Sequence, residues 1–506
     1  MTEIRIEPAG ITKLLKHLNP SKATGPDAIP ARVLRELADE CAKYLTLIFQ
    51  KCLQEKATPE IWKTANGTAI FKKGDRFKAS NYRPVSLTCI CCKIMEHVIV
   101  SNVMKHLTSH NILCDEQHGF RNRRSCETQL VTLVDELASG LDKGKQYDLA
   151  VLDFSKAFDR VPHRRLLAKL ENYGVRGNTL GWIQAFLSNR TQTVVVDGAS
   201  SDPEPVVSGV PQGSVLGPIL FLVFINDLPQ QVQSRTRLFA DDCTLYRQIN
   251  NDLDHHTLQD DLNKLAQWEE KWGMDFHPEK CSILRVHRKR KPSISSYSLK
   301  GHCLSVDKTS KYLGVHLTEN LSWSEHIHKV ITKANSTLGF LRRNLRISNE
   351  DTKSQAYFSL VRPQLEYCSS IWNPSTKKDT NKLEAVQRRA ARYATNRYHN
   401  TSSVTSMIEH LGWESLESRR IKAQLTLFFK VTNDLVDIPA SKYLTPYKAA
   451  TRATHSTRFR LPSISTNYYK FSFFPRTIPV WNKLSATIAE AQSLASFKRG
   501  LSSLTV

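Results

Sequence analysis

The sequence contains little that points to a membrane or to an oxidising compartment. No stretch approaches the ~18 consecutive apolar residues of a membrane-spanning helix, and Met1 is followed by TEIRIEPAG rather than by a basic and then apolar leader. The eleven cysteines are odd in number, and the crowded CICC at 89–92 lacks the spacing of zinc ligands. We therefore expect free thiols in a soluble, intracellular protein without a membrane partner, with nucleus and cytoplasm both open.

Acidic residues are scarce relative to basic ones. The 506 residues include 71 Lys and Arg but only 48 Asp and Glu, which gives a formal net charge of +23 spread over most of the chain. Such an excess favours a polyanionic partner, most often a nucleic acid. A basic protein that binds none, or a ribosome-associated one, would share this composition. The length suffices for two or three domains.

Apolar periodicity predicts several helices. One helix within 30–54 would present a single apolar face made of Val33, Leu34, Leu37, Cys41, Leu45 and Ile48. Residues 125–146 predict a second helix, which begins at a Ser125-x-x-Thr128 pattern and ends at the KGK turn. After about residue 320 the chain is expected to be helical, whereas residues 450–480, rich in Thr, Ser, Arg, Phe and Pro, are expected to be irregular.

Two strand-like segments carry carboxylates in apolar surroundings. Residues 147–154 form an apolar run that reaches Asp153, and RLFADDCTLYR reads as strand, tight turn and strand with Asp241 and Asp242 at the turn. Burying an unpaired carboxylate costs roughly several kcal/mol, so an exposing turn, a salt bridge or a metal ion must offset this cost. An isolated Asp-Asp pair is usually a turn or a cap.

The three carboxylates become more informative when they are taken together. On adjacent strands they could hold hard divalent cations such as Mg²⁺, which take one or two carboxylates plus substrate phosphates. Two such ions about 3.5 to 4 Å apart can clamp the attacking and leaving oxygens of an in-line phosphoryl displacement.

Basic and glycine-containing loops add a second signal. Lys72, Lys73 and Arg83 could grip a triphosphate, and the PQG turn at 211–213 could let the backbone approach a base pair closely. A basic loop is more often a solvated face. The basic run at 285–291 has three readings: an exposed hairpin tip, a nucleic-acid contact or a nuclear-import signal.

Seven sequence blocks in a fixed order give the chain a specific resemblance. The blocks are NYRPVSL at 81–87, QHGFR at 117–121, LDFSKAFD at 152–159, GVPQGSVLGP at 209–218, FADD at 239–242, HPEKC at 277–281 and KYLG at 311–314. Their order resembles the reverse transcriptase of non-LTR retrotransposons of the jockey-like kind, over roughly residues 20–320 and more loosely beyond. Intron-encoded enzymes differ in the YRPVSL block, and retroviral enzymes differ in the residue before the paired aspartates.

The resemblance implies an α+β fold, a right-hand polymerase with fingers, a palm built on an antiparallel sheet with packed helices, and a helical thumb. The expected segments are an N-terminal helical extension of the fingers at 1–60, the reverse transcriptase domain with fingers and palm at 61–318, a thumb at 319–420 and a C-terminal extension of unknown role at 421–506. The implied activity is RNA-directed DNA synthesis by two Mg²⁺ ions, with Mn²⁺ as a substitute. The implied partners are an RNA template, a DNA primer and dNTPs.

Residue roles follow from the blocks. Asp153, Asp241 and Asp242 match the catalytic metal-binding triad, and the backbone carbonyl of Phe154 would be a further metal ligand. Asp159 lies in the same block, but we expect it to cap the following helix.

The remaining matches concern the substrate. Phe158 falls at the steric gate that rejects a ribose 2′-OH, and Arg83 matches a triphosphate contact. Gln212 and Gly213 match the strip that supports the incoming nucleotide. Lys280 falls at the position of a general acid for pyrophosphate.

Two alternatives stay open on the sequence alone. The chain begins at the polymerase's leading extension without an endonuclease, and after residue 320 it shows no ribonuclease H carboxylates or zinc-knuckle spacing. A truncated, catalytically silent relic that at most binds nucleic acid would fit these departures. A host polymerase of telomerase-like or intron-derived type is disfavoured by the block forms.

Overall fold

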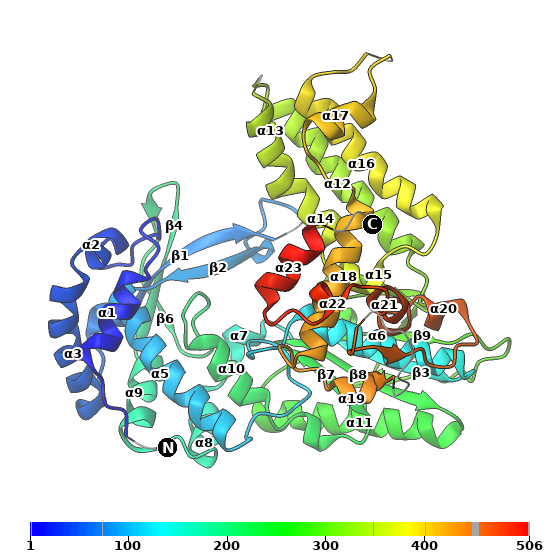
Figure 1. Ribbon diagram of the computed structural model, residues 1–506. Helices are drawn as coiled ribbons and strands as arrows, with labels where there is room; N and C mark the ends of the chain where they lie inside the picture. Colours follow the sequence, from blue (N-terminus) through cyan, green and yellow to red (C-terminus); the bar gives the residue numbers. More distant parts are fainter. Residues whose placement is uncertain (2, 73, 348, 400, 448–454, 504–506) are drawn as a thin grey trace.

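A computed structural model describes residues 1–503 except 2, 73, 348, 400 and 448–454. The described chain has three parts: an N-terminal lobe of helices beside one sheet, a second, central sheet, and an upright group of helices that continues into the C-terminal segment (Figure 1). Helices and strands are mixed and most strand pairs are antiparallel. The expectation of an α+β chain is therefore confirmed at this level.

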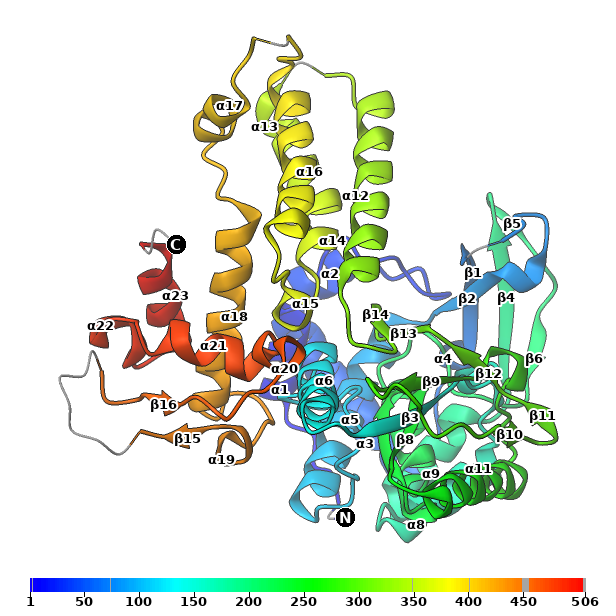
Figure 2. The same ribbon diagram turned by 90° about the vertical axis from the view of Figure 1, so that its right-hand side faces the viewer.

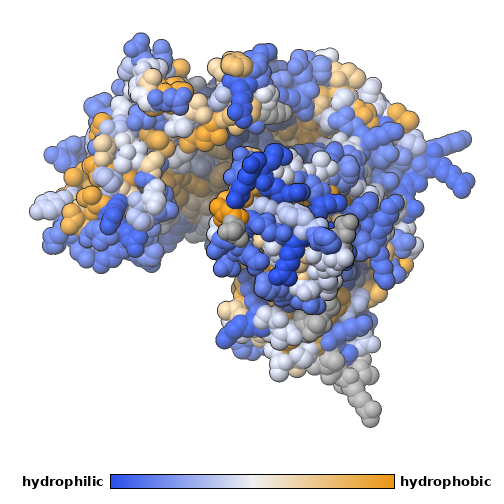
Figure 3. Space-filling view, turned by 90° about the horizontal axis from the view of Figure 1, so that it is seen from above, coloured by the Kyte–Doolittle hydropathy of each residue, from blue (hydrophilic) through white to orange (hydrophobic). Residues whose placement is uncertain are grey.

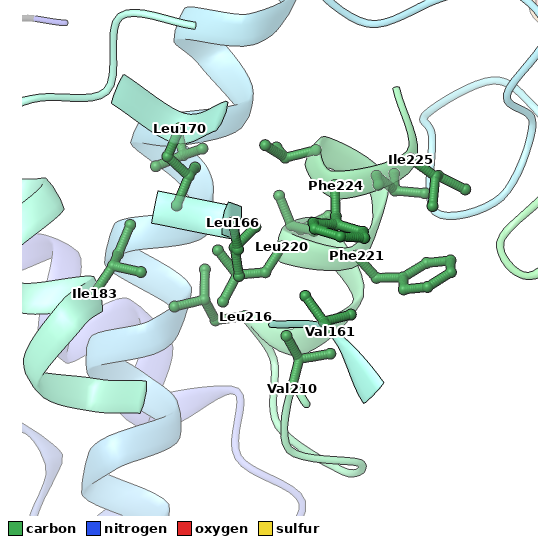
Figure 4. Packing of buried hydrophobic residues seen from close by; sticks show 14 of the residues in the cluster. Val161, Leu166, Leu170, Ile183, Val210, Leu216, Leu220, Phe221, Phe224 and Ile225 are labelled. Carbon is green, nitrogen blue, oxygen red and sulfur yellow. The ribbon is translucent and has the colours of Figure 1, made fainter. Parts of the chain in front are cut away.

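The N-terminal lobe is built around one fully apolar helix, α10 (Gly217–Ile225). Leu216, Leu220, Phe221 and Phe224 from this region lie beside Val161, Leu166, Leu170 and Ile183 in one buried cluster (Figure 4). A helix that is apolar on all sides can be stable only when neighbours surround it. The other helices of the lobe are α1 (Pro8–Lys16), α2 (Ala31–Glu36), α3 (Ala38–Glu55), α4 (Glu60–Lys63), α5 (Ile90–Ser109), α7 (Ala157–Arg160), α8 (His163–Asn172) and α9 (Gly177–Leu187).

The lobe also carries a sheet of order β2-β1-β4-β5, with β6 paired to β4. Its strands are β1 (Thr64–Phe71), β2 (Tyr82–Leu87), β4 (Arg190–Val196), β5 (Ala199–Ser200) and β6 (Glu204–Val206). The β1–β4 pair is parallel and the other pairs are antiparallel. The far end of β1 is exposed, so this sheet projects into solvent beyond the core.

The central sheet has the order β12-β9-β3-β8-β7. Its strands are β3 (Gln146–Leu152), β7 (Arg235–Phe239), β8 (Asp242–Ile249), β9 (Ser282–Val286) and β12 (Ser305–Asp307). Alternate residues face opposite sides of a strand. Ala150 and Leu152 accordingly belong to the same buried cluster as α11 (Asp252–Trp272), whereas Tyr147 and Leu149 belong to the cluster of α6 (Cys126–Asp142). The sheet thus separates two cores.

Short elements follow the central sheet. They are the hairpin β10 (Ser298–Leu299) and β11 (His302–Cys303), the hairpin β13 (Thr309–Tyr312) and β14 (Val315–Thr318), and the 3₁₀ turns η1 (Ala79–Asn81), η2 (Pro229–Gln231) and η3 (Pro278–Lys280).

The upright helices and the C-terminal segment share one core with α6. Figure 2 shows the long helices α12, α16 and α18 standing side by side, with α20 and α21 next to α6. Residue 420, where the thumb is expected to end, lies inside α18. The elements are α12 (Ser324–Asn344), α13 (Glu350–Ala356), the π-helix η4 (Tyr357–Val361), α14 (Arg362–Glu366), α15 (Ser369–Trp372), α16 (Lys377–Thr395), α17 (Val404–His410), α18 (Leu416–Thr432), α19 (Ala440–Tyr443), β15 (Thr445–Pro446), β16 (Phe459–Arg460), α20 (Asn467–Lys470), α21 (Phe473–Trp481), α22 (Ala486–Ala489) and α23 (Leu494–Ser502).

Some expected elements are confirmed and others are wrong. The Ser125–Thr128 capping box starts α6, as predicted. The single helix expected within 30–54 is two helices that meet at Leu37. Its predicted face is confirmed at Leu34 and Leu45, which are buried, and wrong at Val33, Leu37 and Ile48, which are exposed. The small residues of α3 allow close packing instead, so the buried face holds Ala38, Ala42, Leu45 and Phe49.

The irregular segment expected at 450–480 is wrong in its second half. Residues 448–454 lie outside the described residues, but α20 and α21 follow at 467–481. Proline does not prevent α21, since Pro475 occupies the first turn, where an N–H would have no partner, and Pro479 removes only one further bond. Throughout the described residues no helix is both long and apolar enough to cross a bilayer.

Candidate active site

Strand register brings the three predicted aspartates to one end of the central sheet. Strands β3 and β8 are antiparallel neighbours with Leu152 opposite Cys243, so Asp153 follows the end of β3 where Asp242 begins β8. Phe239 pairs with Asp242 across a two-residue turn of Ala240 and Asp241.

Burial and the negative charges of neighbouring aspartates raise the pKa values of Asp241 and Asp242. Partial loss of solvation raises the pKa of Asp242 to about 6, and the negative charges of Asp241 and Asp153 add to the rise. The residue is nevertheless exposed to solvent at its surface. Desolvation likewise raises the pKa of Asp241, with a contribution from Asp153, while Arg83 and Lys72 lower it in part. Carboxylates crowded so that the ionised forms of Asp241 and Asp242 are disfavoured are the donor set that a divalent cation would neutralise.

The backbone beside the cluster offers one more oxygen. Phe154 and Phe276 form an isolated bridge in which Ser155 donates to the Asp275 carbonyl and His277 donates to the Asp153 carbonyl. Among the described residues no donor bonds the carbonyl of Phe154. The buried Phe154 ring stacks on Phe276 with centroids 4.2 Å apart, which fixes this stretch of backbone.

The three carboxylates lie at the same end of the sheet but do not form a complete metal-binding site by themselves. No group of three or more His, Cys, Asp or Glu side chains in the described part of the chain is arranged as a ready-made metal site. Mg²⁺ keeps several waters and uses one or two carboxylates together with substrate phosphates. Carboxylate oxygens such as those of the three aspartates are suitable ligands for such an ion.

Cations surround the cluster on several sides. The Lys280 ammonium lies 3.6 Å from an Asp153 carboxylate oxygen. Arg83 pairs with Ile70 in the β1–β2 ladder and is exposed like Lys72, which donates its backbone N–H to Asn81. Both cations act electrostatically on Asp241. Lys73 lies outside the described residues.

Two residues near the aspartates were missed by sequence reasoning. Lys311, inside the quoted KYLG block, lowers the pKa of Asp242. Gln117, inside the QHGFR block, bonds the backbone of Ala240. In both cases the block itself was the only available signal, because neither residue type indicates its role by composition or periodicity.

The PQG loop is fixed from two directions. The Gln212 carbonyl accepts from the Ser86 N–H of β2 at 2.8 Å. Gly213 adopts φ +99°, and a Cβ at this position would lie only 2.7 Å from the Ser86 carbonyl oxygen. The Gln212 amide donates to the Asp159 carboxylate at 2.8 Å. The expectation that Asp159 caps the following helix is therefore wrong: it lies within α7, and its carboxylate binds the loop because the chain folds back onto it.

Phe158 lies between the core and this loop. Its half-buried ring stacks on Phe221 with centroids 4.5 Å apart, and its carbonyl accepts from the Val210 N–H at 2.7 Å. A cavity of about 320 Å³ lies next to it, lined by Pro84, Ser86, Asp159, Val210 and Gln212 among others. The structure thus brings Gln212, Gly213 and the backbone of Phe158 together.

The larger cavity, of about 680 Å³, lies elsewhere, between α6, β8 and the C-terminal segment. The candidate active site is not an enclosed cavity. Seen from above, the surface is hollowed between the lobe on the left and the rest of the molecule, with hydrophilic residues along both sides (Figure 3). A polymer substrate needs such an open approach.

The basic run at 285–291 divides into two environments. Arg285 belongs to β9, is buried, and pairs with the fully buried Asp148, so including it in a basic loop was wrong. Asp148 also accepts from the Tyr297 hydroxyl at 2.9 Å. Val286 also belongs to β9, whereas residues 287–291 lie in the connection from β9 to β10, where Arg288 lies over the Tyr468 ring of the C-terminal segment. This connection does not join two paired strands, so the hairpin-tip reading is wrong.

Comparisons with known proteins agree with this geometry. Residues 70–317 match the family model described as reverse transcriptase (RNA-dependent DNA polymerase). The chain is 31% identical over 396 residues to the RNA-directed DNA polymerase from mobile element jockey of Drosophila melanogaster, which covers 76% of this chain and 43% of that protein. It is 30% identical over 417 residues to a probable RNA-directed DNA polymerase from transposon BS of the same species, which covers 78% and 45%.

The similarity extends to other elements. The probable RNA-directed DNA polymerase from transposon X-element of Drosophila melanogaster is 28% identical over 403 residues, which cover 77% of this chain and 44% of the relative. The chain thus spans less than half the length of these curated relatives. The match runs from the end of β1 into β14, and so includes the central sheet and all three aspartates. Residues 70–317 therefore form a domain of the reverse transcriptase family, and over about three quarters of its length the chain is similar to the RNA-directed DNA polymerases of non-LTR retrotransposons such as jockey.

Proposed function

We propose that this chain catalyses RNA-directed DNA synthesis by transferring a nucleotide from a dNTP to a primer 3′-OH. The observation that carries the proposal is the convergence of Asp153, Asp241 and Asp242 at one end of the central sheet. An RNA template, a DNA primer and dNTPs are the proposed substrates, and the nucleus or the cytoplasm is the proposed place of action.

In this proposal the parts of the fold take the roles of a right-hand polymerase. The N-terminal lobe, with residues 1–60 as its helical extension, forms the fingers. The central sheet with α6 and α11 is the palm and completes the domain at 61–318. The helices at 319–420 form the thumb. The described part of the last segment, 421–506, packs into the same core as α6 and the thumb helices.

The aspartates would hold two Mg²⁺ ions, or Mn²⁺ in their place, with the Phe154 carbonyl as an additional ligand. When bound, these ions supply charge neutralisation at the attacking and leaving oxygens. The protein contributes positioning. Strands β3 and β8, buried on both faces, fix where the carboxylates stand, and fixed groups need no reorganisation during the reaction.

Other residues act on the substrate. Arg83 and Lys72, with Lys73, would bind the triphosphate. Lys280, 3.6 Å from the Asp153 carboxylate, would donate a proton to the departing pyrophosphate.

The nucleotide itself would rest on the PQG loop. Gln212 and Gly213 would support its base pair, because the loop is anchored to β2 through the Gln212 carbonyl and to α7 through Asp159. Phe158 would exclude a ribose 2′-OH by its bulk.

Primer extension tests the proposal. Purified protein with Mg²⁺, dNTPs and a DNA primer annealed to RNA should extend the primer, and chelation by EDTA should stop the reaction. Asp153→Asn should abolish extension. The matched control is Asp275→Asn, which removes a nearby carboxylate that pairs with Arg160 and stands outside the triad. A wild-type protein that folds but never extends the primer would refute the proposal and favour a silent nucleic-acid-binding protein.

A further inference from the structure

The turn that carries Asp241 is held by a buried glutamine. The side-chain oxygen of Gln117 accepts from the Ala240 N–H at 2.9 Å and from the Gly119 N–H at 2.8 Å, and its amide donates to the Ala240 carbonyl at 3.5 Å. One side chain, only 2% exposed, therefore binds both backbone polar groups of Ala240. Ala240 adopts φ +53°, a left-handed conformation that is unfavourable for a residue with a Cβ. These bonds stabilise the turn in that conformation.

Gln117 is in turn fixed by main-chain bonds. It forms a parallel bridge with Leu238, in which His118 donates to the Leu238 carbonyl at 2.8 Å and Leu238 donates to the Glu116 carbonyl at 2.9 Å. Strand β7 is an edge strand of the central sheet, so this segment covers an edge that would otherwise be unpaired. A Cβ on Gly119 would lie 2.4 Å from the Ala240 nitrogen, so only glycine allows this approach.

A second contact links this loop to the C-terminal segment. The Arg124 guanidinium, 6% exposed, donates to the Gln117 carbonyl at 2.8 Å and pairs with the Asp437 carboxylate. Asp437 also donates its backbone N–H to the Arg123 carbonyl at 3.0 Å. The residues flanking Asp437, Val436 and Ile438, are buried in the core shared by α6 and the upright helices. Residues 434–438 are therefore anchored on one side and hold the loop on the other.

We propose that Gln117 is a positioning residue for the aspartate turn, and that residues 434–438 support it through Arg124. The inference rests on the proposed function of the aspartates and gives the C-terminal segment a role in the same reaction. Gln117 is buried and acts through the backbone of Ala240; in this way it fixes where Asp241 stands. A displacement of about 1 Å at a reacting group can lower a rate about 100-fold, so losing three bonds at this turn should be visible in the rate.

The first test replaces Gln117 by a residue of similar length without hydrogen-bonding groups. Gln117→Met should lower kcat for primer extension by about 10- to 100-fold with KM for dNTP changed by no more than about threefold. Mn²⁺ binding should weaken by about tenfold, because the turn carries the proposed ligands Asp241 and Asp242. It is measured by electron paramagnetic resonance on the complex with a dideoxy-terminated primer, RNA template and dNTP. A merely structural role would leave the Mn²⁺ binding unchanged below the melting temperature.

The second test examines the link to the C-terminal segment at an exposed position. Asp437→Ala should lower kcat about three- to tenfold, because Arg124 loses a partner and the loop loosens. Asp437→Asn keeps an oxygen that can accept from Arg124 and should recover most of that loss. The matched control is Asp142→Ala: Asp142 accepts from the backbone of Ser465 and Thr466 and so anchors the same segment away from the loop. Its kcat should stay within about twofold of wild type.

The outcomes separate the two proposals. If wild type extends the primer while folded Gln117→Met matches it in kcat and Mn²⁺ binding, the positioning role is overturned and the proposed function stands. If Gln117→Met does not fold, the Asp437 pair decides: equal kcat for Ala, Asn and wild type overturns the link. Failure of wild type to extend the primer counts against the proposed function, and Mn²⁺ binding then still reports on Gln117 independently.

Discussion

Asp135 should make the stability of the protein fall with rising pH. This carboxylate of α6 is 7% exposed and accepts from the Ser472 hydroxyl of the C-terminal segment at 3.4 Å. Burial raises its pKa from 3.8 to about 7, although Ser472 and the Lys442 charge offset part of the rise. The native state therefore binds this proton more tightly than the unfolded state does. As a result, stability falls as the pH rises from about 4 to about 7 and is level above that range.

The magnitude follows from the two pKa values. A rise from 3.8 to about 7 corresponds to about 4 kcal/mol at about 1.4 kcal/mol for each tenfold change in proton affinity. The full penalty applies near pH 8, while about 2 kcal/mol of it applies at pH 5. Asp135→Asn is uncharged at every pH and keeps an acceptor for Ser472. We therefore expect the variant to be more stable than wild type, by about 2 kcal/mol more at pH 8 than at pH 5.

Urea unfolding at the two pH values measures this difference. The fluorescence of Trp372 and Trp481, both fully buried in the core shared with α6, reports on the relevant part of the fold. Asp197→Asn, in the exposed turn between β4 and β5, removes the same charge without a buried environment and should shift neither midpoint. A stability gain for Asp135→Asn that is the same at both pH values, or a loss at pH 8, would refute the reasoning.

Three further substitutions test other parts of the account. Phe158→Ala should raise the incorporation of ribonucleotides relative to dNTPs by about tenfold or more, because the side chain that would clash with the ribose 2′-OH is removed. If a competition assay shows unchanged discrimination between the two sugars, Phe158 is not the steric gate. Gly213→Ala should raise KM for dNTP by about tenfold, because the new Cβ would lie 2.7 Å from the Ser86 carbonyl oxygen. The control Gly198→Ala has a similar φ but open space around it, so its KM should not change; equal KM values for the two variants would count against the loop's role. Arg285→Met should cost about 3 to 5 kcal/mol in urea unfolding, because the fully buried Asp148 loses its guanidinium partner and keeps only hydrogen bonds such as those from Tyr297 and Gln146. Adding Asp148→Asn should restore part of that loss, and an additive double variant would contradict the pairing.

The sequence predicts the local part of the site well. An apolar run that stops at Asp153 and a strand-turn-strand around Asp241 and Asp242 are patterns that depend on neighbouring residues alone, and both elements are confirmed. The capping box at Ser125 is local in the same sense. Strand pairing then places the aspartates together without further information.

The errors arise where distant segments decide the outcome. Val33 and Leu37 fit an apolar face by spacing, but the close approach of the neighbouring helices selects the face with Ala38 and Ala42. Asp159 has the position of a helix cap, yet a loop more than fifty residues later supplies its partner. No periodicity in the sequence encodes such contacts.

The proposed role of Asp241 and Asp242, with Asp153, in DNA synthesis on an RNA template is tested most directly by the rate of that reaction. Wild type is compared with the Asp241→Ala, Asp242→Ala double variant for the initial rate of dNTP incorporation into a primer on RNA. Both proteins are assayed with Mg²⁺, after thermal melting has shown that they are equally folded. Wild type should extend the primer, and the double variant should be slower by about 1,000-fold or more. Equal extension by the two proteins would mean that these aspartates do not carry the chemistry.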